Sequence, residues 1–297
     1  MIPQAAQDQY RTQARIAATT AASVAKLWRT LGDDFSSDWV LARPRVLFTV
    51  QQGREAAVRA AIPYTPAVLA ETGQVGPPTG ELIVDRFMAA APDGRPMGSL
   101  IDESVITAKV AVKAGAPVQE ALRSAGSRLT RDVLTALADT RRQVFHADLI
   151  QRPKVGGYTR MLNPPSCSRC IILAGKWFAW NQGFQRHPRC DCIHIPTSES
   201  ASGDFRVGPA DYFNKLSKAE QDATFTKQGA RAIRDGADMN RVENIRLRGL
   251  GTVSSNRRYG TPHRMTVDDI YRVAGTRTNA IRLLEQEGYV LPTIFPR

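Results

Sequence analysis

The stretch YTRMLNPPSCSRCIILAGKWFAWNQGFQRHPRCDCIHIP, residues 158–196, holds all four cysteines of the 297-residue chain and two of its four histidines. The candidate metal ligands in it are Cys167, Cys170, His187, Cys190 and Cys192. The first two form a Cys-x-x-Cys pair, a spacing at which two thiolates reach one ion. A tetrahedral zinc site takes four such ligands, and these five lie within 26 residues. The pattern therefore predicts a Zn²⁺ site in which four protein ligands leave no position for catalytic water.

The cysteines fit two alternatives to a metal site. Buried cysteines can cluster by chance, although this chain would then have placed all four in one stretch. The cysteines can also form disulfides, which are rare in reducing compartments. The start, MIPQAAQDQYRTQAR, has no charged segment followed by an apolar one, so we expect no export signal and disfavour disulfides.

The order of motifs in this stretch resembles the Mu F-type minor head protein domain of tailed bacteriophages. The resemblance rests on the Cys-x-x-Cys pair, on LAGKWF at residues 173–178, on HPRCDC at residues 187–192 and on Pro196. It extends more loosely back to about Val118, since proteins of that family carry a long helical region before the cysteine and histidine cluster. The resemblance covers only this part of the chain.

The resemblance implies a structural protein of the phage head, a minor capsid component that acts in head morphogenesis. Its implied partners are the portal protein and the major capsid protein, with possible contact to packaged double-stranded DNA. Its implied location is the virion, in the capsid interior or near the portal, after assembly in the host cytoplasm. The protein would not be an enzyme and would take no small-molecule substrate.

Apolar periodicity predicts a predominantly α-helical α+β protein with three parts. Residues 1–150 should form a helical domain, residues 151–200 a small β-containing domain around the zinc knuckle, and residues 201–297 a basic helical region. Hydrophobic content of 42% and charged content of 23% are ordinary for a globular protein. The chain has no apolar run of about 18 residues, so we expect no membrane contact.

The N-terminal half carries the clearest helical patterns. Apolar residues from Tyr10 to Leu31 step by three and four, which predicts a helix over residues 4–31. Pro44 should interrupt the next segment, with a helix resuming over residues 46–62. Further helices are expected at residues 81–90, 100–114 and 118–149, the last weakened at Gly126.

Later segments predict shorter elements. Strands are expected at residues 158–162, 171–178 and 192–195, where β-branched and aromatic residues are common. Ser217 with Glu220 forms a capping-box pattern, which predicts the start of a helix. Helices should follow at residues 217–226, 228–235 and 238–247, and a helical hairpin at residues 266–289. His194 and His263 are expected at the surface or behind the metal ligands.

The net charge of +12 is concentrated in two segments. Residues 141–190 carry nine Lys or Arg against one acid, and residues 241–264 carry six Arg against one acid. Such clusters of positive charge favour binding to a polyanion, most simply DNA bound without sequence preference. A solvated surface or contact with an acidic protein ring would explain them as well. The candidate DNA-contacting residues are Arg241, Arg246, Arg248, Arg257, Arg258 and Arg264. A zinc-stabilised DNA-binding module without a virion role is therefore the alternative function.

The hairpin at residues 266–289 bears on the same alternative. As a helix-turn-helix it would place Arg277, Thr278 and Asn279 at the start of a recognition helix. Plain helical hairpins have the same pattern and are commoner.

A zinc deaminase is the enzymatic alternative. Such enzymes combine His-x-Glu with Pro-Cys-x-x-Cys. Here His146-Ala147-Asp148 precedes Pro165-Ser166-Cys167, so Asp replaces the longer Glu and Ser166 separates the proline from the first cysteine. The later histidine and cysteines would have no role, and this alternative is the weakest of the three.

Overall fold

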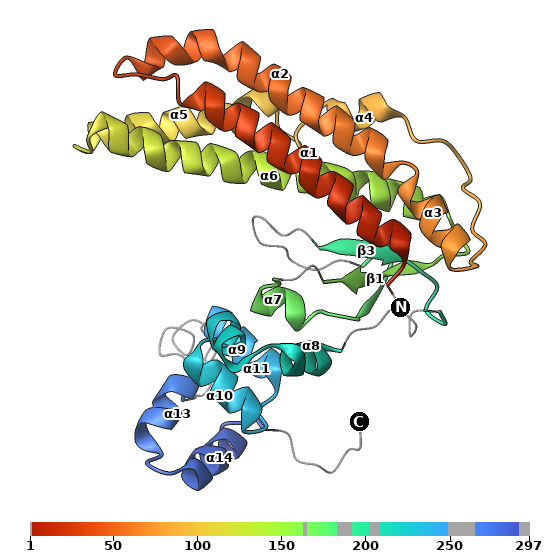
Figure 1. The fold of residues 1–297 in the computed structure, drawn as a ribbon, viewed down its shortest axis with the longest axis vertical. Helices are drawn as coiled ribbons and strands as arrows, with labels where there is room; N and C mark the ends of the chain where they lie inside the picture. Colours follow the sequence, from red (N-terminus) through yellow and green to blue (C-terminus); the bar gives the residue numbers. More distant parts are fainter. Residues whose placement is uncertain (1, 163–164, 183–191, 202–207, 249–264, 291–297) are drawn as a thin grey trace. The chain divides into compact units, whose positions relative to one another are not determined.

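The computed structural model describes residues 2–162, 165–182, 192–201, 208–248 and 265–290. The chain divides into two compact units, residues 1–159 with 177–205 and residues 160–176 with 206–297. The expected predominantly helical α+β class is confirmed, since long helices accompany a small three-stranded sheet (Figure 1). The segment 151–200, expected as a domain of its own, contributes residues to both units.

The first unit is built on four long helices that run beside one another (Figure 1). They are α1 (Gln4–Trp28), α2 (Phe35–Ala61), α5 (Met97–Lys113) and α6 (Val118–Ile150), with the short helices α3 (Tyr64–Glu71) and α4 (Val84–Met88) between them in sequence. The apolar stripe predicted for the first helix is confirmed at its C-terminal half, where Val24 and Trp28 are buried. One continuous apolar core joins all four long helices.

Pro44 lies inside α2 and does not interrupt it, so the predicted break is wrong. Proline removes the N–H that would bond to the carbonyl of Val40, one turn earlier. Both residues lie on the exposed face of the helix, where water can satisfy that carbonyl. Buried Ala42 and Val46 on the opposite face keep the helix packed on the core.

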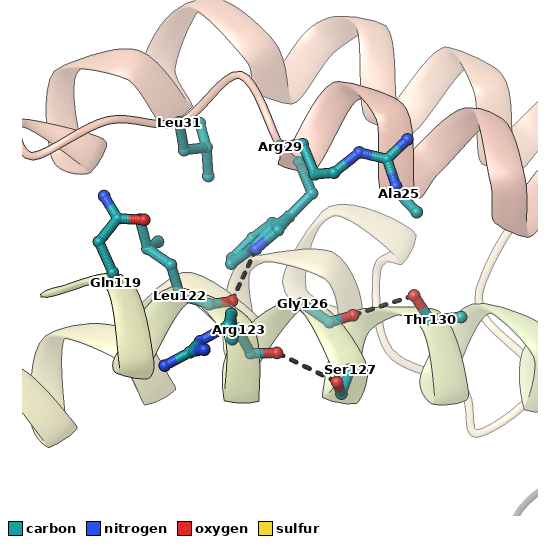
Figure 2. A pocket seen from close by; sticks show the side chains of 10 residues that line it. Ala25, Arg29, Leu31, Gln119, Leu122, Arg123, Gly126, Ser127 and Thr130 are labelled. Atoms are coloured by element: carbon teal, nitrogen blue, oxygen red, sulfur yellow. Dashed lines mark hydrogen bonds between the residues drawn. The ribbon is translucent and has the colours of Figure 1, made fainter.

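Gly126 does not break α6 either. Its small size allows α1 to pack closely on α6. A Cβ at this position would lie 2.6 Å from Cδ1 of Trp28. The indole Nε1 of Trp28 donates a hydrogen bond to the carbonyl of Leu122 at 2.9 Å, one turn before Gly126 (Figure 2). The glycine therefore lets a large aromatic ring lie directly on the helix backbone.

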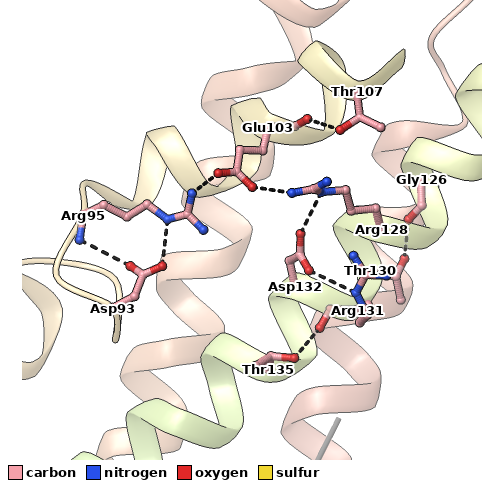
Figure 3. Close-up of polar contacts among 10 residues, drawn as sticks. All are labelled: Asp93, Arg95, Glu103, Thr107, Gly126, Arg128, Thr130, Arg131, Asp132 and Thr135. Carbon is pink, nitrogen blue, oxygen red and sulfur yellow. Dashed lines mark hydrogen bonds and ion pairs between the residues drawn. The ribbon is translucent and has the colours of Figure 1, made fainter. Parts of the chain in front are cut away.

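Charged side chains connect the helices at their edges. Glu103 of α5 accepts hydrogen bonds from Arg95 and from Arg128 of α6, and Arg128 also contacts Asp132 at 3.4 Å (Figure 3). These donors lower the pKa of the Glu103 carboxyl from its ordinary value. The ion pairs therefore connect the loop before α5, α5 itself and α6.

Arg54 of α2 is fully buried and connects three parts of the bundle. Its guanidinium donates to the Thr140 hydroxyl at 3.1 Å, to the Phe87 carbonyl at 2.7 Å and to the Ala90 carbonyl at 2.5 Å. Burial lowers the pKa of Arg54 from its ordinary value, although a guanidinium remains charged in proteins. Carbonyls at and just after the C-terminal end of α4 are thus satisfied by a buried cation.

The sheet has the strand order β2-β1-β3, with β1 (Gly157–Met161), β2 (Trp177–Ala179) and β3 (Ile193–Pro196). β1 pairs with β2 in antiparallel register, with Tyr158 opposite Phe178. Strands were predicted in all three places. The middle prediction, residues 171–178, is right only at its end, because Ile171 ends the helical turn α7 (Ser168–Ile171) and residues 172–175 form turns.

The second unit consists of short helices besides α7. They are α8 (Pro209–Lys215), α9 (Lys218–Phe225), α10 (Lys227–Arg234), α11 (Met239–Arg248), α13 (Val267–Val273) and α14 (Arg277–Gln286). The predicted capping box is confirmed, with Ser217 and Glu220 bonding each other's backbone N–H groups. A small core that includes Val242, Ile270 and Leu284 joins α10, α11, α13 and α14. Among the described residues of either unit, no helix is long and apolar enough to cross a bilayer.

Candidate functional site

The Cys-x-x-Cys pair forms a helical turn in the second unit. Cys167 caps the start of α7, and the backbone N–H groups of Cys170 and Ile171 both donate to its carbonyl at 3.0 Å. Residues three apart on such a turn lie on the same face. Cys167 is exposed and Cys170 is buried. The local fold therefore brings the two cysteines together within one helical turn, with Cys167 open to solvent.

A buried arginine contacts the second thiol. Nη2 of Arg160, near the end of β1, lies 3.1 Å from Sγ of Cys170, and both side chains are buried. A guanidinium favours a negative partner, and the thiolate is the form of cysteine that binds metals. This contact suits a metal-binding role for Cys170.

Ser168, between the two cysteines, connects the turn to α11. Its hydroxyl donates to Oε1 of Glu243 at 2.6 Å, and Arg246 bonds to the same carboxylate at 2.7 Å and to the Ser168 hydroxyl at 3.1 Å. Glu243 is fully buried. A buried carboxylate needs this pairing, so the three residues fix the orientation of the cysteine turn within the second unit.

Cys192 belongs to the first unit and directly precedes β3. Its side chain is buried, and its carbonyl accepts a hydrogen bond from Arg141 of α6 at 3.0 Å. His194 follows in β3 and is only 4% exposed, so of the two positions expected for it, the one at the surface is wrong. The reason is its packing, because its ring stacks on Tyr158 with the centroids 4.4 Å apart.

Aromatic rings surround His194. The ring centroids of Phe145 and His146, both on α6, lie 5.5 and 5.4 Å from the ring centroid of His194. The hydroxyl of Tyr64 on α3 donates to the His194 carbonyl at 2.8 Å. Burial raises the pKa of that hydroxyl above its ordinary value, against the opposing charge of Arg141. These contacts fix the strand that directly follows Cys192.

The five predicted ligands are thus placed as follows. Cys167 and Cys170 lie in the second unit and Cys192 in the first, while His187 and Cys190 fall outside the described residues. Within the part of the chain that is described, no group of three or more His, Cys, Asp or Glu side chains is arranged to hold a metal. The zinc site stays a prediction of the sequence.

The predicted DNA-contacting arginines are described only in part. Arg241 bonds to the Gly288 carbonyl, and Arg246 pairs with Glu243, so both have partners inside the unit. Arg248 ends α11, while Arg257, Arg258 and Arg264 lie outside the described residues, as does His263. DNA binding by this set stays a prediction.

The hairpin of α13 and α14 forms where it was predicted. Thr278 and Asn279 are exposed at the start of α14, and Arg277 pairs with Asp235 at 2.8 Å. Despite burial, hydrogen bonds from Tyr271 and Arg277 keep the pKa of Asp235 below its ordinary value. Arg277 therefore helps to stabilise the unit, and the two residues after it remain accessible.

The pattern that suggested a deaminase is divided between the units. His146 and Asp148 lie on α6 of the first unit, whereas Cys167 and Cys170 lie in the second. Asp148 accepts hydrogen bonds from Nε of Arg152 at 3.1 Å, and both side chains are buried. Its carboxylate thus has a structural partner at the C-terminal end of α6.

Sequence reasoning missed Arg160, Glu243 and Arg141 as residues that support the cysteine segments. A single basic or acidic residue carries no local signal for such a role.

Comparison of the chain with known proteins found no match. No protein-family model, no curated protein and no solved structure matches it.

Proposed function

We propose that this chain is a non-enzymatic structural protein of a tailed-phage head, a minor capsid component that contacts the portal and major capsid proteins during assembly. The observation that carries the proposal is the motif order in residues 158–196, with its resemblance to the Mu F-type minor head proteins. Its location would be the capsid interior or portal region, and the host cytoplasm before assembly.

The surface hollows of the first unit are compatible with a structural role. Two of them, lined by residues of α1, α2 and α6, include no acidic, histidine or cysteine side chain. A third, beside Tyr64 and His194, has a volume of about 10 Å³, which is too small for a substrate. Catalysis usually needs convergent acid, base or nucleophile groups in a pocket, and the lining of the first two hollows does not supply them.

Zinc enters the proposal as a folding element. Four of Cys167, Cys170, His187, Cys190 and Cys192 would hold it, and thiolate with imidazole is a donor set that suits this ion. The Arg160 contact with Sγ of Cys170 fits an anionic ligand. A bound ion would tie together two cysteine segments that lie more than 15 residues apart in sequence.

Co-purification with the portal protein of the same phage tests this function. The full chain, co-expressed with tagged portal, is expected to elute with it in a defined ratio by size exclusion. Tagged major capsid protein provides the second bait, and an unrelated oligomer of similar charge is the control. Elution of the chain alone from both baits would contradict the assembly role.

DNA binding is a second candidate function, and exposed Thr278 and Asn279 at the start of α14 favour it. With basic residues concentrated at 241–264, binding should be independent of sequence and should weaken steeply with salt. Replacing Arg257 and Arg258 with Ala should reduce the slope of affinity against salt by about two phosphate contacts. Binding that persists unchanged in high salt would remove this candidate.

A further inference from the structure

The first unit carries a surface groove between α1 and α2, apart from the cysteine segments. The groove has a volume of about 550 Å³. Its apolar lining includes Leu27 of α1 with Pro44 and Phe48 of α2, and its charged lining is Lys26 and Arg45. None of its lining residues is acidic, so the groove combines an apolar floor with positive edges.

Apolar side chains continue from the groove along the exposed face of α2. Val40, Leu41 and Phe48 are 69%, 77% and 63% exposed. With Pro44 they occupy positions that repeat every three to four residues, so they share one helix face. The opposite face, with Val46 and Val50, fills the core of the bundle. Apolar residues gathered on one face in this way mark an interaction site more often than single ones do.

The cations around this face have no intramolecular partner among the described residues. Within the described ranges, the charged groups of Lys26 and Arg45 take part in no ion pair or hydrogen bond, whereas the guanidinium of nearby Arg43 pairs with Asp102 at 2.7 Å. A second hollow of about 340 Å³ lies on the other side of α1 (Figure 2). Its charged lining residues are Arg29 and Arg123, again without an acid.

We propose that the groove between α1 and α2 binds an acidic amphipathic helix of another protein. Apolar side chains of that helix would enter between Leu27 and Phe48, as in other helix-in-groove complexes. Its carboxylates would lie against Lys26 and Arg45 and give the complex its orientation. Duplex DNA fits less well, because a phosphate backbone gains nothing from covering Val40, Leu41 and Phe48. The proposal does not depend on a role in the phage head.

The test uses the full chain and two fluorescein-labelled synthetic 18-residue peptides. The first has Leu at every third or fourth position and Glu elsewhere, and the second has Lys in place of each Glu. Fluorescence anisotropy at low salt should show the Glu peptide binding at least about tenfold more tightly than the Lys peptide. That preference should shrink as salt screens the charges.

Variants at the groove distinguish binding in the groove from attraction of the peptide to the overall positive charge of the chain. Lys26→Glu with Arg45→Glu should reverse the preference between the peptides, and Phe48→Ser should weaken the Glu peptide about tenfold. The matched control lies on α5, where Ile106 is 57% exposed and Lys109 and Lys113 are also exposed. Ile106→Ser, and separately Lys109→Glu with Lys113→Glu, should leave both affinities unchanged. Circular dichroism melting checks that every variant is folded.

Several results would overturn the proposal. These are equal binding of the two peptides, no binding of the Glu peptide, or equal losses in the α5 control variants. Sedimentation that shows self-association abolished by Phe48→Ser would assign the groove to a second copy of the chain. Competition by a 20-base-pair DNA duplex, lost in the Lys26→Glu, Arg45→Glu variant, would assign it to nucleic acid.

Discussion

Two helices of the first unit and two of the second are stabilised in different ways. Helices α1 and α6 of the first unit are 25 and 33 residues long, begin after a proline and have no side-chain cap. Helices α9 and α14 of the second unit have 8 and 10 residues and are capped by Ser217 and Thr276. Long helices gain stability from burying an apolar stripe, whereas short ones depend more on capping and polar contacts. The second unit should therefore be the more easily disrupted.

Loss of the bound zinc should have the largest effect on the difference in stability between the two units. The purified chain is expected to contain about one zinc per molecule, since a structural site binds a single ion. Cys170→Ser should lower zinc content and melting temperature together, because structural zinc contributes on the order of 10 kcal/mol to folding in small domains. Metal analysis with calorimetry measures both. Metal-free wild-type protein that melts at the same temperature as the variant would disprove the zinc site.

Equivalent truncations in the two cores compare the units directly. Leu129 on α6 and Leu284 on α14 are both fully buried. Each change to Ala should cost about 2–5 kcal/mol through lost burial and the cavity left behind. In urea unfolding of the full chain, Leu284→Ala should shift an early transition and Leu129→Ala a later one. Equal shifts of one shared transition would show that the units unfold together.

Replacing the buried carboxylate of Glu243 should have a smaller effect on the stability of the second unit. Glu243→Gln removes the charge that pairs with Arg246 and holds Ser168. The expected cost is about 1–3 kcal/mol, below the full value for a buried pair because Arg246 is 37% exposed. The Gln variant should also take up zinc more weakly. Exposed Glu285→Gln is the control, and an equal loss there would remove the special role of Glu243.

The Glu103 ion pairs of the first unit should give the smallest effect. Arg95 and Arg128 hold the pKa of Glu103 below its ordinary value, so folding favours the carboxylate. This stabilisation is present above the ordinary pKa of about 4.3 and is lost as pH falls through the lowered one. Glu103→Gln should cost less than about 1 kcal/mol at pH 7, because the pairs are partly exposed.

Urea midpoints at pH 7, 5 and 3 measure that cost. The difference between wild type and Glu103→Gln should be present at pH 7 and 5 and shrink toward pH 3. Glu120→Gln, exposed in the first turn of α6, is the control. A difference that grows as the pH falls would contradict the assigned direction.

Local sequence patterns predicted much of the fold, because stripes and caps act within a few residues. Such patterns correctly predicted the stripe through Val24 and Trp28, the capping box at Ser217 and the hairpin around Gly275. Helices α3 and α8 were not predicted, and each has a proline in its first turn, Pro66 and Pro209. Proline is tolerated in the first turn of a helix, where no N–H bond is lost.

The candidate site was predicted less completely. The cysteine spacing gave the Cys-x-x-Cys turn, but the contacts that support it join residues far apart in sequence. Ser168 meets Glu243 across 75 residues, and Tyr64 meets the His194 carbonyl across 130. Burial of His194 depends on such contacts, so no neighbouring residue indicates it. Tertiary packing determines these contacts, and they cannot be predicted from local patterns in a single sequence.

The most direct measurement of the proposed head role is quantitative mass spectrometry of procapsids and virions assembled in cells that express this chain. The structural role predicts peptides from both units in at least one of the two particles, at a few copies for every hundred or more of the major capsid protein. The chain should remain with the particles through density-gradient purification and a salt wash. Its absence from both particles, with abundant free protein in the same lysate, would contradict the role in head assembly.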